Sequence, residues 1–150
     1  MNPFLLLYQT LESTAPADFY KLESDFFPAF YSHIPENQRP DCVVAFLTIS
    51  TWMGTSLRSG VWTYYEGANP AEIETTRRFL KEHGSPELEA MFAYGIHDYQ
   101  NPVYRETFDY PEEWIAQSDT IDQWITEKET TIQEWLRAVL LKNKEMICAL

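Results

Sequence analysis

The sequence is poor in glycine, in cysteine and in positive charge, and each shortage excludes a class of function. Only five glycines occur in 150 residues, and none lies in a phosphate-binding series. The two cysteines, Cys42 and Cys148, match no metal or redox spacing, so two reduced thiols are expected. Lysine and arginine together number 11 against 23 aspartates and glutamates, which gives a formal net charge of −12. Because such a surface repels phosphates, neither nucleic acid nor a membrane is an expected partner.

Long hydrophobic runs are missing as well. The apolar run that begins the chain, from Met1 to Tyr8, is shorter than a usual signal-peptide core, and no basic segment precedes it. No other stretch approaches the roughly 20 apolar residues of a membrane-spanning helix. These absences predict a cytoplasmic protein.

The residues that are present predict a folded, all-α protein. The chain is 45% hydrophobic and 15% aromatic, which is far more apolar than a disordered chain. Its length is sufficient for a hydrophobic core, and no linker or repeat divides it. We therefore expect residues 1–150 to form a single acidic domain, a compact multi-helix bundle.

Capping signals mark several helices. Asn69 and Pro70 predict a helix that ends at Gly84, and Ser85 followed by Pro86 predicts the next helix. Its apolar residues extend to 99, and a loop follows at 100–102. Asp41 is placed as the N-cap of a helix whose apolar residues cover nearly every face, which predicts a central, buried helix.

Two segments are less regular. Residues 18–32 carry aromatic and aliphatic side chains at helical spacing, with Pro28 expected to kink or split the helix. Residues 58–65 are rich in β-formers but short, and we interpret them as a turn followed by a short aromatic helix. The aromatic cluster Trp62, Tyr64 and Tyr65 lacks surrounding positive charge, so core packing is expected rather than base stacking, although part of it could line a protein interface.

Residues that could carry catalysis are scarce. His33, His83 and His97 form no metal-binding arrangement, and we interpret His83 and His97 as helix-end histidines that interact with the last carbonyl groups. Glu112 and Glu113 are adjacent in a polar stretch, where the shifted pKa that acid–base catalysis requires is not expected. The sequence therefore predicts no catalytic residue, no metal site and no cofactor.

The last third of the chain separates apolar from acidic residues. Apolar residues from Ile121 to Val139 share one side of a helical wheel, and carboxylates occupy the other. Between Glu106 and Glu134 there are nine carboxylates and one lysine. A solvated helix face is the simpler interpretation, and a partner-binding face is the alternative. The candidate partner-binding residues are Glu112, Glu113, Asp119, Asp122, Glu127, Glu129 and Glu134.

The spacing of these carboxylates bears on whether they imitate DNA. In a straight helix, the five carboxylates from Asp119 to Glu134 span about 22 Å, or one charge per roughly 4.5 Å. One DNA strand carries a phosphate about every 3.4 Å and the duplex a charge about every 1.7 Å. The helix alone is too dilute, but the acidic residues at 106–113 or a second subunit would raise the density towards that of DNA.

A resemblance gives this idea more weight. Residues 35–39 (Pro-Glu-Asn-Gln-Arg), residues 60–65 (Gly-Val-Trp-Thr-Tyr-Tyr) and the C-terminal pattern of Ile121, Asp122, Ile132, Trp135, Leu136 and Asn143 resemble the bacterial DNA mimic protein family. Where that family carries Asn-Gly-Gly-aromatic, this chain has residues 58–62 (Arg-Ser-Gly-Val-Trp). The resemblance implies an all-helical fold, a homodimer, and an acidic surface that occupies the DNA-binding face of a transcriptional regulator.

Three hypotheses follow. The first is a DNA mimic that binds a basic DNA-binding protein, such as a transcription factor. The second is an acidic immunity-type or adaptor protein that neutralises another basic partner. The third is an enzyme or small-molecule binder whose site the sequence does not reveal, and a deep pocket lined by polar groups would favour it.

Overall fold

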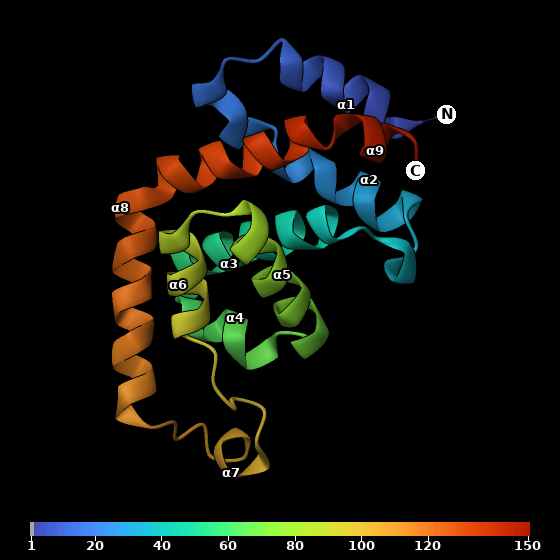
Figure 1. The fold of residues 1–150 in the computed structure, drawn as a ribbon. Helices are drawn as coiled ribbons and strands as arrows, with labels where there is room; N and C mark the ends of the chain where they lie inside the picture. The colour runs from blue at the N-terminus through green and yellow to red at the C-terminus, as the bar shows by residue number, and fades with distance from the viewer. Residues whose placement is uncertain (1) are drawn as a thin grey trace.

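The computed structural model describes residues 2–150 and contains helices and turns, with no strand in that range. Figure 1 shows the helices gathered into one bundle, which confirms the predicted compact all-α fold. The α-helices are α1 (Pro3–Glu12), α2 (Phe26–His33), α3 (Asp41–Ser59), α4 (Val61–Gly67), α5 (Pro70–His83), α6 (Pro86–Tyr94), α7 (Pro102–Arg105), α8 (Glu112–Lys142) and α9 (Lys144–Cys148). Three short 3₁₀ helices are η1 (Pro16–Lys21), η2 (Glu23–Asp25) and η3 (Glu36–Gln38).

The predicted central helix is α3. Four consecutive residues, Leu47 to Ser50, are buried, and at 100° per residue they point to all sides of the helix. α4, α5 and α8 pack around it. Buried side chains from Phe4 to Ile147 form a single hydrophobic cluster, so segments from all parts of the chain contribute to one core.

A buried hydrogen-bond chain ties three of these helices together. Trp52 Nε1 of α3 donates to the hydroxyl of Tyr65 in α4 at 2.9 Å, and that hydroxyl donates to the carbonyl oxygen of Phe92 in α6 at 2.8 Å. Burial raises the pKa of the Tyr65 phenol far above its ordinary value, so the proton that it donates is retained at neutral pH. The polar atoms of this part of the core are therefore satisfied.

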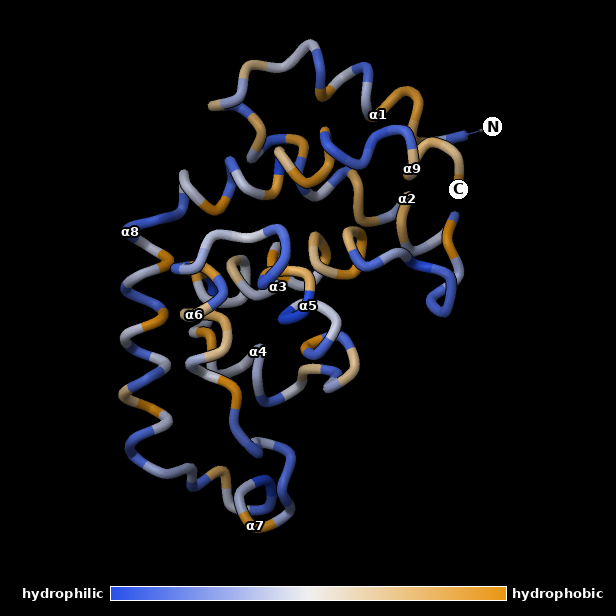
Figure 2. Tube along the Cα trace, viewed as in Figure 1, coloured by the Kyte–Doolittle hydropathy of each residue, from blue (hydrophilic) through white to orange (hydrophobic). Residues whose placement is uncertain are grey.

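Helix α8 is bent. Lys128 has φ −111° and ψ 17°, outside the helical range, and divides α8 into a first arm, residues 112–127, and a second arm, residues 129–142. In Figure 1 the first arm runs along one edge of the molecule, and the second arm crosses to α9. Hydrophobic and hydrophilic residues alternate along both arms (Figure 2).

Packing accounts for this bend. Neither proline nor glycine lies between Glu112 and Lys142. The first arm lies against α4 and α6, and the second arm lies against η1. A straight helix would leave one of these surfaces uncovered. The predicted apolar stripe is confirmed on both arms, because Ile121, Ile125, Ile132 and Leu136 are all buried.

The two ends of the described chain lie side by side, as Figure 1 shows. Asn2 caps α1 by accepting from the backbone N–H of Phe4 at 2.9 Å, and its Nδ2 donates to the carbonyl oxygen of Cys148 at 2.6 Å. Further along α1, the hydroxyl of Tyr8 donates to the carbonyl oxygen of Leu140 at 2.7 Å. The first helix is thus held by α8 and α9.

Several predicted boundaries were wrong. The segment 18–32 is split, but not at Pro28, because 3₁₀ turns occupy it up to Asp25 and α2 begins at Phe26. Pro28 lies in the first turn of α2, where its missing N–H has no helical partner to lose. Asp41 is the first residue of α3 rather than its N-cap. α6 ends at Tyr94, not at residue 99, because Gly95 terminates it.

The positions of six residues on the apolar stripes predict that they are buried, and five of them are: Phe46, Leu47, Trp52, Phe92 and Ile132. Trp135 is half-buried, and its Nε1 donates to the carbonyl oxygen of His83 at 3.3 Å. In the aromatic cluster at 62–65, Tyr65 is buried, Tyr64 is half-buried and Trp62 is exposed, so core packing holds for the tyrosines only. Among the helices of residues 2–150, none combines the length and the apolar composition of a membrane span.

Candidate protein-binding surface

The first arm of α8 carries a row of exposed carboxylates. At about 100° per residue, these side chains fall within about 120° of one another on the helical wheel. The buried residues Ser118, Ile121 and Ile125 lie on the opposite side. This separation confirms that the arm has an apolar and an acidic face. We call the exposed carboxylates the acidic ridge, and its members are Glu112, Glu113, Asp119 and Glu127.

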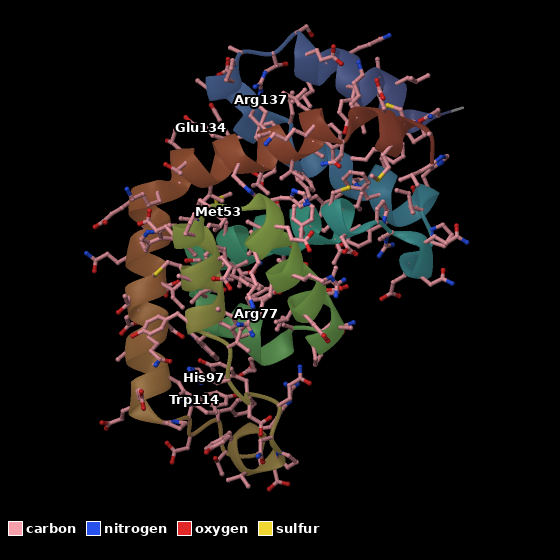
Figure 3. All side chains as sticks on the ribbon, in the orientation of Figure 1. Met53, Arg77, His97, Trp114, Glu134 and Arg137 are labelled. Atoms are coloured by element: carbon pink, nitrogen blue, oxygen red, sulfur yellow. The ribbon has the colours of Figure 1, made fainter. Side chains whose placement is uncertain are left out.

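The bend removes two predicted residues from this ridge. Glu129 and Glu134 are exposed, but they lie on the second arm, around a hollow that they share with Tyr20. Figure 3 shows Glu134 on that arm, near Arg137. The expected straight row of carboxylates from Asp119 to Glu134 is therefore wrong, because the helix changes direction at Lys128.

Asp122 has a structural role. Its Oδ1 accepts from the backbone N–H of Val61 at 2.8 Å and from the hydroxyl of Ser56 at 2.6 Å. Val61 is the first residue of α4, so its N–H has no partner within the helix. The carboxylate of Asp122 thus caps α4 from a neighbouring helix. This bonded, half-buried oxygen is not free for a partner, and we leave Asp122 out of the ridge.

The acidic ridge is not neutralised within the molecule. The ion pairs among residues 2–150 join Lys21 to Asp18, Arg78 to Asp41, His83 to Glu82, and Lys144 to Glu12. None of them involves α8. The ridge carboxylates therefore present uncompensated charge to solvent, which attracts cations and basic proteins.

An exposed apolar residue lies beside the ridge in sequence. Phe108, in the loop between α7 and α8, is 64% exposed and has φ 54°, in the left-handed region that non-glycine residues rarely adopt. Val103 and Ile115 are also exposed, and the acidic residues Glu106 and Asp109 flank Phe108. Strained, exposed aromatic residues of this kind are enriched at binding sites.

The loop that carries Phe108 is held firmly. The hydroxyl of Tyr110 donates to the carboxylate of Glu66, and Arg105 Nη1 donates to the carbonyl oxygen of Glu66 at 2.9 Å. The ring of Tyr104 packs on Trp114, the third residue of α8, with centroids 5.0 Å apart. These contacts fix the loop against α4 and α8, so Phe108 is presented in a defined position.

Of the two histidines that were expected at helix ends, only one lies at a helix end. His83 is the last residue of α5, as predicted. His97 lies beyond α6, where its ring stacks on Trp114 with centroids 4.6 Å apart and an interplanar angle of 5°. Its Nε2 forms a hydrogen bond with Oε1 of Gln117. The prediction for His97 was wrong because α6 stops at Tyr94, before this residue.

No group of three or more His, Cys, Asp or Glu side chains in the described chain is arranged to hold a metal ion. Compared with known protein families, with curated proteins and with solved structures, the chain shows no match. The resemblance to the DNA mimic family therefore stays a prediction from the quoted residues.

Proposed function

We propose that this protein binds a basic protein through the acidic ridge, and that the partner is a DNA-binding protein whose DNA-binding face it occupies. The observation that carries the proposal is the row of four exposed carboxylates with no internal cation. A DNA-binding face is positively charged, so it attracts such a row at long range. The resemblance to the DNA mimic family supports the same partner and implies a homodimer, which sedimentation of the purified chain tests.

A second candidate is the neutralisation of a basic partner that does not bind DNA. The first arm carries one exposed carboxylate per about 5.6 Å, against about 3.4 Å between phosphates of a DNA strand. In addition, Phe108 is an apolar side chain beside the carboxylates, which the edge of a DNA duplex does not offer. Both observations suit a protein surface that combines basic residues with an apolar pocket.

Neutralising the ridge is expected to slow association with the partner. The partner is first recovered from native lysate at low salt and released at high salt. The variant Glu112→Gln, Glu113→Gln, Asp119→Asn, Glu127→Gln should then associate about tenfold more slowly at low salt, because long-range attraction steers the encounter. Surface plasmon resonance at two salt concentrations measures the rate.

A matched control separates the ridge from the overall charge. The variant Asp25→Asn, Glu36→Gln, Glu82→Gln, Glu145→Gln also removes four exposed carboxylates, so both proteins carry −12 + 4 = −8. The control should associate about as fast as wild type. Equal rates for both variants would show that the ridge is only solvated. Displacement of duplex DNA from the partner by wild type distinguishes a DNA mimic from the second candidate.

Phe108 should contribute to affinity but not to stability. The substitution Phe108→Asn places a residue that tolerates φ 54° at this position and removes the exposed ring. Affinity should fall by about 2 kcal/mol, mainly through faster dissociation. The free energy of unfolding should stay constant or rise by up to about 1 kcal/mol. An unchanged dissociation rate would exclude Phe108 from the interface.

A further inference from the structure

A cavity away from the acidic ridge is lined by basic residues, although the protein as a whole is acidic. It has a volume of about 510 Å³, within the range of small-molecule sites. One wall is α5, and the other is the segment 96–100 that follows α6. The side chains of Tyr65 and Ile73 supply apolar lining.

Arg77 is the notable residue of this cavity. It is half-buried, and its Nε is shielded from solvent without a hydrogen-bond partner among the described residues. No ion pair or hydrogen bond in residues 2–150 engages its guanidinium group. Buried donors of charged groups are normally satisfied. Arg77 therefore lines the cavity with a guanidinium group that no acceptor in the described chain engages.

Two further basic side chains beside Arg77 increase the positive charge of the cavity. Lys81 lies one turn further along α5 and lines the same cavity, and like charges at this spacing are unfavourable in an isolated helix. Arg78 also lines the cavity and pairs with Asp41 at 3.2 Å. Two carboxylates, those of Glu74 and Asp98, lie among the lining residues and offset part of this charge. Neither is within ion-pair distance of Arg77.

Hydrogen bonds and ring stacking hold the wall opposite α5 in place. Gln100 Nε2 donates to the carbonyl oxygen of Ala68 at 2.7 Å, which fixes the segment 96–100 to the connection between α4 and α5. His97 is held by its stacking on Trp114 and its bond to Gln117. Figure 3 shows His97 and Trp114 next to one another, below Arg77 in this view.

We infer that this cavity binds a small organic anion, a molecule with a carboxylate or phosphate group on an apolar body. The guanidinium of Arg77 would take the anionic group in a two-point contact, since its fork matches both groups. Lys81 would add charge, and Tyr65 and Ile73 would contact the apolar body. The net charge of −12 opposes general anion binding, so anion binding here depends on these local cations. The inference does not depend on the acidic ridge.

Amide chemical shifts of the ¹⁵N-labelled full chain test this. The probes are benzoate and phenyl phosphate, with benzyl alcohol as the uncharged counterpart. We expect one of the anions to shift the amides of α5 and of residues 95–100 saturably, and the tighter anion identifies the preferred head group. Absence of saturation for both anions, or equal binding of benzyl alcohol, would overturn the inference.

Two arginine variants of equal net charge localise the site. Arg77→Gln should weaken the binding of the anion about tenfold or more. Arg58→Gln replaces an exposed arginine outside the cavity, and its affinity for the anion should stay within about twofold of wild type. Equal losses in the two variants would contradict a site at Arg77. If Arg77→Gln does not fold, the exposed Lys81 gives the same test through Lys81→Gln, for which a smaller but clear loss is expected.

Discussion

Replacing Gly95 with alanine is expected to destabilise the protein by about 3 kcal/mol, because the new methyl group has no space. A Cβ atom at this position would lie 2.4 Å from Cε2 of Tyr65 and 2.8 Å from Cδ1 of Ile121. The Tyr65 ring has little freedom to move, since its hydroxyl is bonded to Trp52 and Phe92. Urea denaturation of wild type and variant measures the difference.

The control for this substitution is Gly54→Ala. Gly54 is exposed in the interior of α3, and no atom would lie within 4 Å of its Cβ. Alanine is favoured over glycine there, so stability should rise by about 0.5–1 kcal/mol. The same chemical change thus has opposite expected signs at the two positions. A Gly95→Ala variant as stable as wild type would contradict the close packing of Tyr65 on Gly95.

Replacing Asp122 with alanine is expected to cost about 2 kcal/mol of stability. The substitution leaves the N–H of Val61 and the hydroxyl of Ser56 without their shared acceptor. α4 begins at Val61, so its start should loosen. Chemical denaturation gives the free energy, and hydrogen exchange at residues 61–64 shows whether the loss is located at α4.

Asp119→Ala is the matched control for this prediction. Asp119 is on the same arm, three residues earlier, but it is exposed, and its carboxylate takes part in none of the side-chain hydrogen bonds of this arm among the described residues. Its replacement should change stability by less than about 0.5 kcal/mol. Asp122→Asn retains an accepting oxygen and should fall between the two alanine variants. If Asp122→Ala and Asp119→Ala are equally stable, the cap on α4 does not contribute to the free energy of unfolding.

Short local signals predicted a large part of this fold. Asn69–Pro70 and Ser85–Pro86 mark the starts of α5 and α6, where the side chain of the first residue accepts a backbone N–H. The same Asn–Pro pair occurs at Asn2 and at Asn101, and both cap helices, α1 and α7, that were not predicted. The signal was present there, but α7 is only one turn long and followed an expected loop.

Tertiary contacts explain what could not be predicted. The bend at Lys128 has no proline or glycine to announce it, and it follows from the two surfaces that α8 covers. Asp122 is separated by 61 positions in the sequence from Val61 and by 66 from Ser56, the two residues that donate to it. Its sequence neighbours therefore do not reveal these hydrogen bonds. The cavity at Arg77 could likewise not be predicted, because its other wall is the segment 96–100, which is distant from Arg77 in the sequence.

The placement of α1 beside the end of the chain has a consequence for synthesis. The buried face of α1 packs on α2, where Phe4 meets Phe30 and Tyr8 meets Phe26. It is completed by α9 and by the hydrogen bond from Tyr8 to Leu140 in α8. A chain leaving the ribosome therefore carries this apolar helix with only α2 to cover it until those last helices emerge. During that interval α1 is a natural target for chaperones that recognise exposed hydrophobic segments.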